Sequence, residues 1–471
     1  MASTEGQFHA ATWLFLRLLG LVYLLAFWSF GVQVPGLIGA NGILPAAELM
    51  EWASRSEISW HQLPTLCWIS AGDGFLAALW IAGVVLSLLV IFAVLEPLAL
   101  FGCWLLYLSL VSVGRTWMAF QWDNLLLEVG FAAIFLAPIA WRTGRALPAP
   151  PLLMVRLFHL LAFRLSFSSG IAKFTSGDQA WSGLSALRFH FETQPLPTAL
   201  GWYWHQWPAW FHSASVIAVI VLQVFLPFLF LGPWWARRTA AFGTLGMQGL
   251  IALTGNYGFF NLVAMAMCVL ALDDALLRWP RWERSGVPLS RARRGLTGAV
   301  AAALLAGNLA VLGRTVDLVE ARWLEPIGAF RSLNGYGLFA VMTTRRVEIV
   351  LEGRRDGEDW QAYELFHKPG DLARRPSFVA PHMPRLDWQM WFAALGSAEQ
   401  NRWIYALADR LLAGRPEVSA LFAHDPFRGS APRYLRARSY DYRFTSFEER
   451  RATGAWWRRT ELGEYLAPRT R

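Results

Sequence analysis

The chain has 471 residues, of which 55% are hydrophobic and 16% are charged, and its formal net charge is +9. An ordinary soluble domain carries roughly 25% charged residues, so this composition excludes a disordered or purely soluble protein and indicates membrane segments. Three cysteines are too few for a disulfide scaffold or a structural zinc site.

The charges divide the chain into two parts. Residues 1–314 contain 18 Lys and Arg and 13 Asp and Glu, whereas residues 315–471 contain 24 and 20. The second part has the charge density of a water-facing domain and is long enough to bury its own core. We therefore expect a multi-span transmembrane domain over 1–314, followed by a soluble domain over 315–471.

The first part contains about nine apolar stretches that approach the roughly 20 residues needed to span a bilayer. No Lys or Arg precedes the first stretch, and it lacks a small-residue cleavage site, so it does not resemble a cleavable signal peptide. The predicted spans are 11–31, 74–93, 97–113, 125–141, 151–171, 213–232, 238–253, 256–272 and 296–313.

Nine spans place alternate connections on opposite sides of the membrane. One side collects ten arginines and the other four basic residues, and the positive-inside rule makes the first side cytoplasmic. The N-terminus is then cytoplasmic and residues 315–471 are extracytoplasmic; an even number of spans would reverse the tail. The ten arginines face anionic lipid on this topology, so nucleic-acid binding loses its support. They are Arg142, Arg145, Arg237, Arg238, Arg278, Arg281, Arg284, Arg291, Arg293 and Arg294, against Arg55, Arg115, Lys173 and Arg188.

Ionisable groups inside spans are costly and are first treated as functional candidates. Asp123 and Glu128 begin the fourth span, five residues and therefore about 140° apart around a helix. They cannot form one carboxylate pair, and we expect each to meet its own cation on a neighbouring helix. The favoured alternative to a functional role is a buried structural ion pair or an interfacial cap.

The fifth span is the most polar. Ser166, Ser169 and Lys173 share one helical face, with Arg164 beside it. A lysine near hydroxyl groups in a low dielectric can lose its proton and act as a base. For Lys173, a structural ion pair is favoured over catalysis, and contact with a substrate is a third possibility. If the lysine is charged, its candidate partners are Asp123, Glu128 and Asp178.

Further polar and aromatic residues follow on the same predicted side. A loop carries Asp178, Trp181, His190 and Glu192, and the Trp-rich segment 202–212, which contains His205, is typical of an interfacial aromatic belt. No HxxxH or CxxC spacing is present, so no metal site is predicted. Asn256 lies in the polar turn 255–261. These segments together predict one extracytoplasmic cavity.

The tail has a different pattern. Short strands are predicted at 338–342, 346–352, 360–366 and 436–444, and a helix over 387–412. We expect a soluble α+β domain with a β-sandwich-like core. The tail shows no Ser-His-Asp order and no phosphate-binding loop, which indicates a binding or lid domain.

Six long runs of this sequence closely resemble the lipase maturation factor family. They are QWDNLLLEVGF (121–131), FRLSFSSGIAKFTSGDQAW (163–181), FHFETQPLPTALGWYWHQWPAWFH (189–212), GNYGFFN (255–261), NGYGLFAVMTT (334–344) and FVAPHMPRLDWQMWFAAL (378–395). The resemblance implies a polytopic membrane protein with a lumenal C-terminal domain. It also implies that eukaryotic members lie in the endoplasmic reticulum membrane and assist the folding and assembly of dimeric lipases.

The membrane half is also distantly similar to the vitamin K-dependent gamma-carboxylase-like superfamily. Its small-Gly-x-x-Lys…Trp pattern matches Ser169, Gly170, Lys173 and Trp181. In the carboxylases a lysine in this region is the active-site base, so the resemblance implies that role for Lys173. The match is short and does not import the carboxylase substrate or its quinone, and no cofactor is predicted.

Two main functions therefore remain in view, with a lipid transporter or scaffold as a third alternative. The first is a membrane chaperone that binds a partly folded secreted client, such as a lipase, and performs no bond chemistry. The second is a membrane-embedded enzyme with Lys173 as base, positioned by Arg164, Asp123 and Glu128. High Ala, Arg and Trp usage with few Lys suggests a bacterial inner membrane, with membrane lipid as a further partner.

Overall fold

The computed structural model describes residues 7–143, 146–147, 149–277, 283–284 and 289–470. Within these residues, six helices are long and apolar enough to cross a bilayer, so the chain is a multi-pass integral membrane protein. They are α1 (His9–Gly31), α4 (Asp73–Ile91), α5 (Glu96–Gly114), α7 (Leu152–Thr175), α11 (Ala209–Ile220), which continues through a π-helical turn and a 3-10 turn to Leu231, and α15 (Arg291–Thr315).

The other three predicted spans also fall on helices, but these are shorter or more polar. They are α6 (Gln121–Leu136), α12 (Trp234–Thr254) and α13 (Phe260–Val269). The ten residues of α13 rise only about 15 Å, and α12 carries Arg237 and Arg238 near its start. Six helices rather than nine thus have the length and composition of independent spans.

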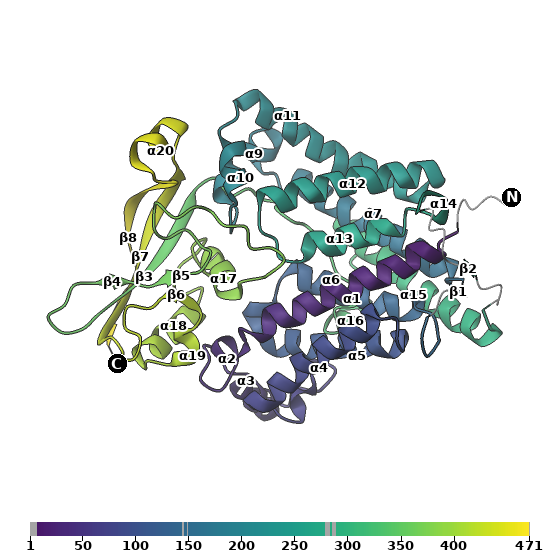
Figure 1. Ribbon diagram of the computed structural model, residues 1–471, viewed down its shortest axis with the longest axis horizontal. Coiled ribbons are helices and arrows are strands. Elements are labelled where there is room, and N and C mark those ends of the chain that lie inside the picture. The colour runs from purple at the N-terminus through teal and green to yellow at the C-terminus, as the bar shows by residue number, and fades with distance from the viewer. Residues whose placement is uncertain (1–6, 144–145, 148, 278–282, 285–288, 471) are drawn as a thin grey trace.

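Short helices connect or flank these long ones. They are α2 (Val34–Leu37), α3 (Ala46–Arg55), α8 (Gln179–Ser182), α9 (Ala186–Thr193), α10 (Ala199–His205), α14 (Asp274–Leu277) and α16 (Glu325–Gly328). Strands β1 (Ala146–Leu147) and β2 (Glu283–Arg284) pair in parallel. Figure 1 shows the long helices side by side along the long axis, with β1 and β2 at one end and the C-terminal sheet at the other.

The C-terminal region is built on one four-stranded antiparallel sheet of order β4-β3-β7-β8. Its strands are β3 (Arg346–Arg354), β4 (Gln361–Ala362), β7 (Tyr434–Phe444) and β8 (Trp457–Thr470); β5 (Glu364–Leu365) and β6 (Phe422–His424) pair separately. Helices α17 (Arg385–Ala393) and α18 (Trp403–Leu412) contact β3 and β7, while α19 (Pro416–Ser419) and α20 (Phe447–Thr453) are short. The expected α+β content is present, but a helix-packed sheet replaces the sandwich.

Two local predictions for the tail were wrong. The predicted strand 338–342 is a loop, whose backbone groups are taken by side chains of the membrane region, as described below. The predicted helix 387–412 is interrupted between α17 and α18, where Ser397 N donates to Gln400 Oε1 and Asn401 Nδ2 donates to Ser397 O. Such local side-chain bonds compete with helical ones.

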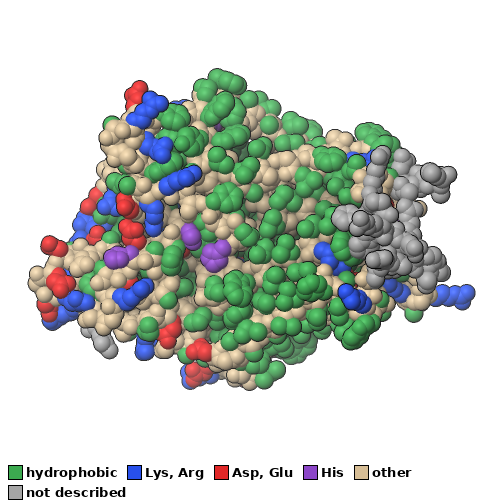
Figure 2. Space-filling model, viewed as in Figure 1, with side chains coloured by type: hydrophobic (Ala, Val, Ile, Leu, Met, Phe, Trp, Pro, Cys, Tyr) green, Lys and Arg blue, Asp and Glu red, His purple; other side chains and the backbone are tan. Residues whose placement is uncertain are grey.

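One hydrophobic core runs from the membrane helices into the C-terminal region. Leu19 and Leu126 belong to the same buried cluster as Met383, Trp388 and Leu407. Close helix approach supports it, since a Cβ at Gly83 of α4 would collide with the Phe27 ring of α1. Figure 2 shows apolar side chains over the helical body and most charged ones over the C-terminal end.

Ten arginines were predicted to be cytoplasmic. Those that the structure describes lie at the end of the molecule opposite the C-terminal sheet (Figure 1). Arg142, Arg291 and Arg294 are exposed. Two others do not face lipid as expected, because Arg237 is buried and donates to Gly232 O at 3.0 Å, and Arg238 pairs with Asp273 at 2.5 Å. Arg145, Arg278 and Arg281 lie outside the described residues, as does the side chain of Arg284.

Candidate functional site

A cavity of about 230 Å³ lies between α7, α9, the α11 segment, α12 and α13. Its wall is mostly apolar. From α7 it includes Ser166, Ser169 and Lys173, the three residues whose shared face the sequence predicts, because the spacing i, i+3, i+7 returns to one side of a helix. The cavity therefore contains the most polar face of the fifth predicted span.

Lys173 is 6% exposed and stands in the last turn of α7. Its Nζ donates to Ser169 O at 2.8 Å and to Leu338 O at 2.9 Å, and it lies 5.1 Å from the centre of the Trp181 ring. A cation is favoured at a helix C-terminus and over an indole face. Among the described residues, no carboxylate lies within ion-pair distance of this ammonium group.

His190 and Tyr257 form the polar part of the opposite wall. Tyr257 OH donates to Gln194 Oε1 at 2.7 Å and lies 3.1 Å from His190 Nε2, so the imidazole donates to the phenol oxygen. Burial, with a smaller contribution from the charge of Lys173, lowers the pKa of His190 to about 4. The histidine is thus neutral at pH 7, and Lys173 is the only Lys or Arg among the residues that line the cavity.

A loop from the C-terminal region, residues 334–344, forms part of the cavity wall and is called the strap below. Three residues of the predicted site hold it: Lys173 bonds Leu338 O, Trp181 Nε1 donates to Phe339 O at 2.9 Å, and Asp178 Oδ2 accepts from Met342 N at 3.1 Å. Asp178 also caps α8 through Ala180 N and Trp181 N.

The strap contributes two cavity-lining residues that the sequence analysis did not include, Leu338 and Phe339. Tyr257 was also missed as a site residue. The sequence did contain a signal for the strap, because residues 334–344 form one of the runs that resemble the lipase maturation factor family. That run was interpreted as containing a strand. A strand ladder would need the same backbone groups that Lys173, Trp181 and Asp178 bond here.

Asp123 and Glu128 meet separate cations, but not next to Lys173. Arg385 of α17 donates to both oxygens of Asp123, at 2.6 and 2.8 Å, and Tyr107 OH donates to Asp123 Oδ1 at 2.6 Å. Glu128 pairs with Arg164 and accepts from Tyr336 OH at 2.6 Å. These carboxylates therefore attach the membrane helices to the C-terminal region.

Asn256 makes a third attachment. Its Nδ2 donates to Leu196 O and Ser377 O at 3.0 and 2.9 Å, and its Oδ1 accepts from Val379 N and Ala380 N at 2.7 and 3.0 Å. All of its usual hydrogen bonds are made. We call the contacts of Asp123, Glu128 and Asn256 with the C-terminal region the clasp.

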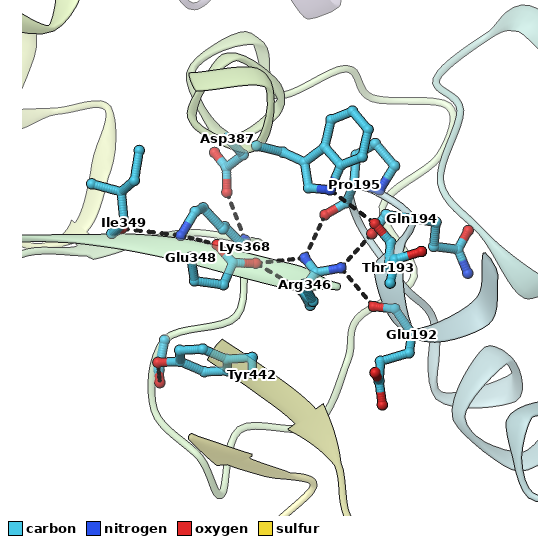
Figure 3. Close-up of polar contacts among 12 residues, drawn as sticks. Glu192, Thr193, Gln194, Pro195, Arg346, Glu348, Ile349, Lys368, Asp387 and Tyr442 are labelled. Carbon is cyan, nitrogen blue, oxygen red and sulfur yellow. Dashed lines mark hydrogen bonds and ion pairs between the residues drawn. The ribbon is translucent and has the colours of Figure 1, made fainter. Parts of the chain in front are cut away.

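Arg346 of β3 makes a further buried junction, drawn in Figure 3. Its guanidinium donates to the carbonyls of Glu192, Gln194 and Pro195, at 2.8, 2.5 and 2.9 Å, and pairs with Glu348 at 2.6 Å. Glu348 also pairs with Lys368. The end of α9, which carries the predicted site residue Glu192, and the residues just after it are thus fixed to the C-terminal sheet.

Glu192 and His205 lie away from the cavity containing Lys173. Glu192 pairs with Arg443 at 3.0 Å and accepts from Phe444 N at 2.9 Å, and His205 Nε2 lies 3.7 Å from its carboxylate. Both line a separate cleft beside β7. Trp202, predicted in the interfacial belt, is instead fully buried against Trp456, whereas Trp210 of the same segment is 68% exposed.

The predicted arrangement of one catalytic cluster is therefore corrected. In the part of the chain that the structure describes, the cavity lining contains Lys173, Trp181 and His190, but not Asp123, Glu128 or Arg164. The latter three have partners on other elements, since Arg164 is committed to Glu128 and Asp123 to Arg385. Within the same residues, no three His, Cys, Asp or Glu side chains come together as metal ligands.

Acidification is expected to loosen the junction between α1 and the C-terminal region. Burial, with the nearby His367 and Arg385 charges, lowers the pKa of His382 to about 4, and its Nδ1 lies 3.0 Å from Ser29 Oγ. A histidine in the unfolded chain titrates near 6.5. The stabilisation is therefore complete above pH 6.5 and is lost as the pH falls toward 4, by about 1–2 kcal/mol at pH 5.

The measurement is the unfolding midpoint in detergent at pH 7.5 and pH 5.0. His382→Gln should show a smaller loss on acidification than the wild-type protein. His61→Gln, at an exposed histidine, is the control and should keep the wild-type difference. An unchanged pH difference in His382→Gln would contradict this assignment.

Comparison with known proteins places these features in one family. Residues 10–279 match the family model described as the lipase maturation factor transmembrane domain, and residues 332–467 match the lipase maturation factor C-terminal domain. No solved structure matches the chain.

Full-length relatives agree with the domain matches. Lipase maturation factor 2 from Homo sapiens is 33% identical over 96% of this chain and 82% of the relative. Lipase maturation factor 1 from Bos taurus is 33% identical over 99% of this chain and 90% of the relative. The protein described here, with its helical membrane region and clasped C-terminal sheet, belongs to the lipase maturation factor family.

Proposed function

We propose that the protein assists the folding of secreted proteins, such as lipases, without bond chemistry of its own. The observation that carries this proposal is the family match across both regions, to relatives named for lipase maturation. The clasp adds support, because it attaches the C-terminal region to one end of the membrane helices, where a client emerging from the membrane is within reach.

The proposed client surface is the outer edge of β8. Sheet order places this strand of 14 residues at an edge, and most of its side chains are exposed. An edge strand presents free backbone donors and acceptors to an extended segment of another chain. A partly folded client offers such segments before its own sheets are complete.

We also propose that the chain crosses the membrane nine times, in the orientation predicted from the sequence. The helices that fall on the nine predicted ranges run alternately between the end with Arg142 and Arg291 and the end with the C-terminal sheet. The positive-inside rule then favours a cytoplasmic N-terminus and a tail, residues 315–471, outside a bacterial inner membrane. Alkaline phosphatase fused after Arg471 should be active; an inactive fusion with an active cytoplasmic reporter would reverse the orientation.

Client folding is tested in a strain that lacks this gene and expresses a secreted lipase. Enzymatic activity per mass of secreted lipase should fall at least several-fold and recover with the wild-type gene. The double variant Thr460→Lys/Leu462→Lys adds charge along β8 and should fail to restore activity. Ala452→Lys, on the exposed part of α20, is the matched control and should restore it.

Equal recovery with both variants would exclude the β8 edge as the client surface, and unchanged lipase activity in the deletion strain would reject the maturation role for that client. Deleting the tail is a poor test, because residues of the C-terminal region belong to the same buried core as the membrane helices. The deletion would remove part of that core along with any client surface.

A membrane enzyme with Lys173 as base is the second candidate. It is favoured by the position of this amine in the cavity beside His190 and Tyr257. Lys173→Arg preserves a positive charge but not a base. Loss of lipase maturation in both Lys173→Arg and Lys173→Ala, with normal protein levels, would support the enzyme. Recovery with both variants would remove it.

A further inference from the structure

Lys173 differs from most buried cations of this protein, because no carboxylate lies within ion-pair distance of it; among the described residues it shares this with Arg237, which bonds a backbone carbonyl outside the cavity. Four other buried cations have a carboxylate partner: Arg17 with Glu96, Arg164 with Glu128, Arg346 with Glu348, and Arg385 with Asp123. The chain has two lysines, and the other, Lys368, pairs with Glu348. A buried charge without a counter-ion is costly, so an anion that enters the cavity gains a strong interaction.

Most other polar side chains that line the cavity already have hydrogen-bond partners within the protein. Ser169 Oγ donates to Leu165 O, and Thr254 Oγ1 donates to Leu250 O, so both hydroxyls are used within their helices. Asn261 Nδ2 donates to Gln248 Oε1 at 2.7 Å. No Asp or Glu is among the lining residues. Lys173 is thus the single charged contact that the cavity offers.

The remainder of the cavity is apolar and reaches the lipid-facing surface. Leu222 and Met247 lie within its wall, and Leu250 lines it while remaining 50% exposed on the outside of α12. Ala218 of α11 likewise lines the cavity and is exposed. The cavity therefore opens sideways between α11 and α12, into the region that membrane hydrocarbon occupies.

We propose that this cavity binds a single-chain amphiphile with a carboxylate head, of the long-chain fatty acid class. The carboxylate pairs with Lys173 under the strap, and the acyl chain lies along Leu222, Met247 and Leu250 toward the bilayer. A volume of about 230 Å³, below the roughly 300–1,000 Å³ of common ligand pockets, fits one chain better than the two chains of a phospholipid. Binding of such an amphiphile does not require the client-folding function proposed above.

The test measures binding of cis-parinaric acid and of the alcohol with the same chain to the full-length protein in detergent. The wild-type protein should bind the acid at least about tenfold more tightly, as a charge-assisted hydrogen bond contributes about 1.5–3 kcal/mol. Lys173→Met should remove this preference and leave the alcohol affinity nearly unchanged. Lys173→Arg should retain most of it. A merely structural lysine would weaken both ligands equally in Lys173→Met.

The acyl path is tested separately from the charge. Leu250→Trp fills the wall of the cavity and should weaken both ligands at least about tenfold, whereas Leu253→Trp, on the same helix at 48% exposure and outside the cavity lining, should bind as the wild type does. The unfolding midpoint of each variant confirms folding. Because no client is present, these results do not depend on lipase maturation.

Three outcomes would overturn the proposal. The first is that the wild-type protein binds acid and alcohol with equal affinity, and the second is that Leu250→Trp binds as well as Leu253→Trp. The third is that phosphatidylglycerol displaces the acid at lower concentration than unlabelled palmitate does. The last result would make the cavity a phospholipid site. If Lys173→Met does not fold, Lys173→Arg and the two tryptophan variants still decide the question.

Discussion

Asp123→Ala is expected to destabilise the protein by about 3–5 kcal/mol, the usual cost of removing one partner from a buried ion pair. The carboxylate and the Arg385 guanidinium are both fully buried, and Tyr107 OH also depends on Asp123. The variant leaves a buried cation without a counter-ion at the junction of α6 and α17. Chemical unfolding in detergent and trypsin cleavage within residues 315–471 measure the effect.

Two controls separate the buried charge from a general effect of substitution. Glu51→Ala removes one partner of the pair with Arg55, whose side chains are 62% and 76% exposed, and should cost less than about 1 kcal/mol. Asp123→Leu/Arg385→Met removes both buried charges and should be more stable than Asp123→Ala. An Asp123→Ala protein as stable as Glu51→Ala would show that the clasp does not depend on this pair.

Arg346→Met is expected to cost a similar amount, about 3–5 kcal/mol, for a different reason. The guanidinium satisfies three carbonyl groups at the end of α9 and just after it, as well as Glu348 (Figure 3). Methionine fills part of the space but leaves these acceptors buried without donors. Hydrogen exchange of residues 192–198 should accelerate together with the loss of global stability.

Arg346→Lys tests the geometry of this junction. The ammonium keeps the charge beside Glu348 but cannot reproduce the fork that reaches several acceptors at once, so we expect intermediate stability. Arg438→Met is the control, because Arg438 pairs with Glu461 at the partly exposed surface of the sheet. Equal stability of Arg346→Met and Arg438→Met would contradict the structural role assigned to Arg346.

Hydrophobic length made the membrane helices predictable, because a bilayer imposes nearly the same requirement on every span. Each predicted range falls on a helix, including the short α13. Whether α6 and α12 cross the membrane was less predictable, since both helices carry charged side chains whose partners lie elsewhere in the fold. Arg238 belongs with Asp273, and Glu128 with Arg164.

The site was predictable only where its residues share one element. Ser166, Ser169 and Lys173 face the same cavity because helical periodicity requires it. The clasp partners were not predictable, since Asp123 and Arg385 are separated by 262 residues and one sequence carries no record of that pairing. The same limitation led to the proposal that Asp123 and Glu128 position Lys173, when each has a nearer cation.

Asp123 and Arg385 are also synthesised at different times, because they lie far apart along the chain. A chain grows at about 5–20 residues per second, so Arg385 follows Asp123 by about 13 to 50 s. During this interval the first helices reach the membrane with a carboxylate whose counter-ion does not yet exist. Asp123 must stay hydrated at the membrane surface until the tail arrives. A chain that ends before Arg385 therefore lacks the counter-ion of Asp123.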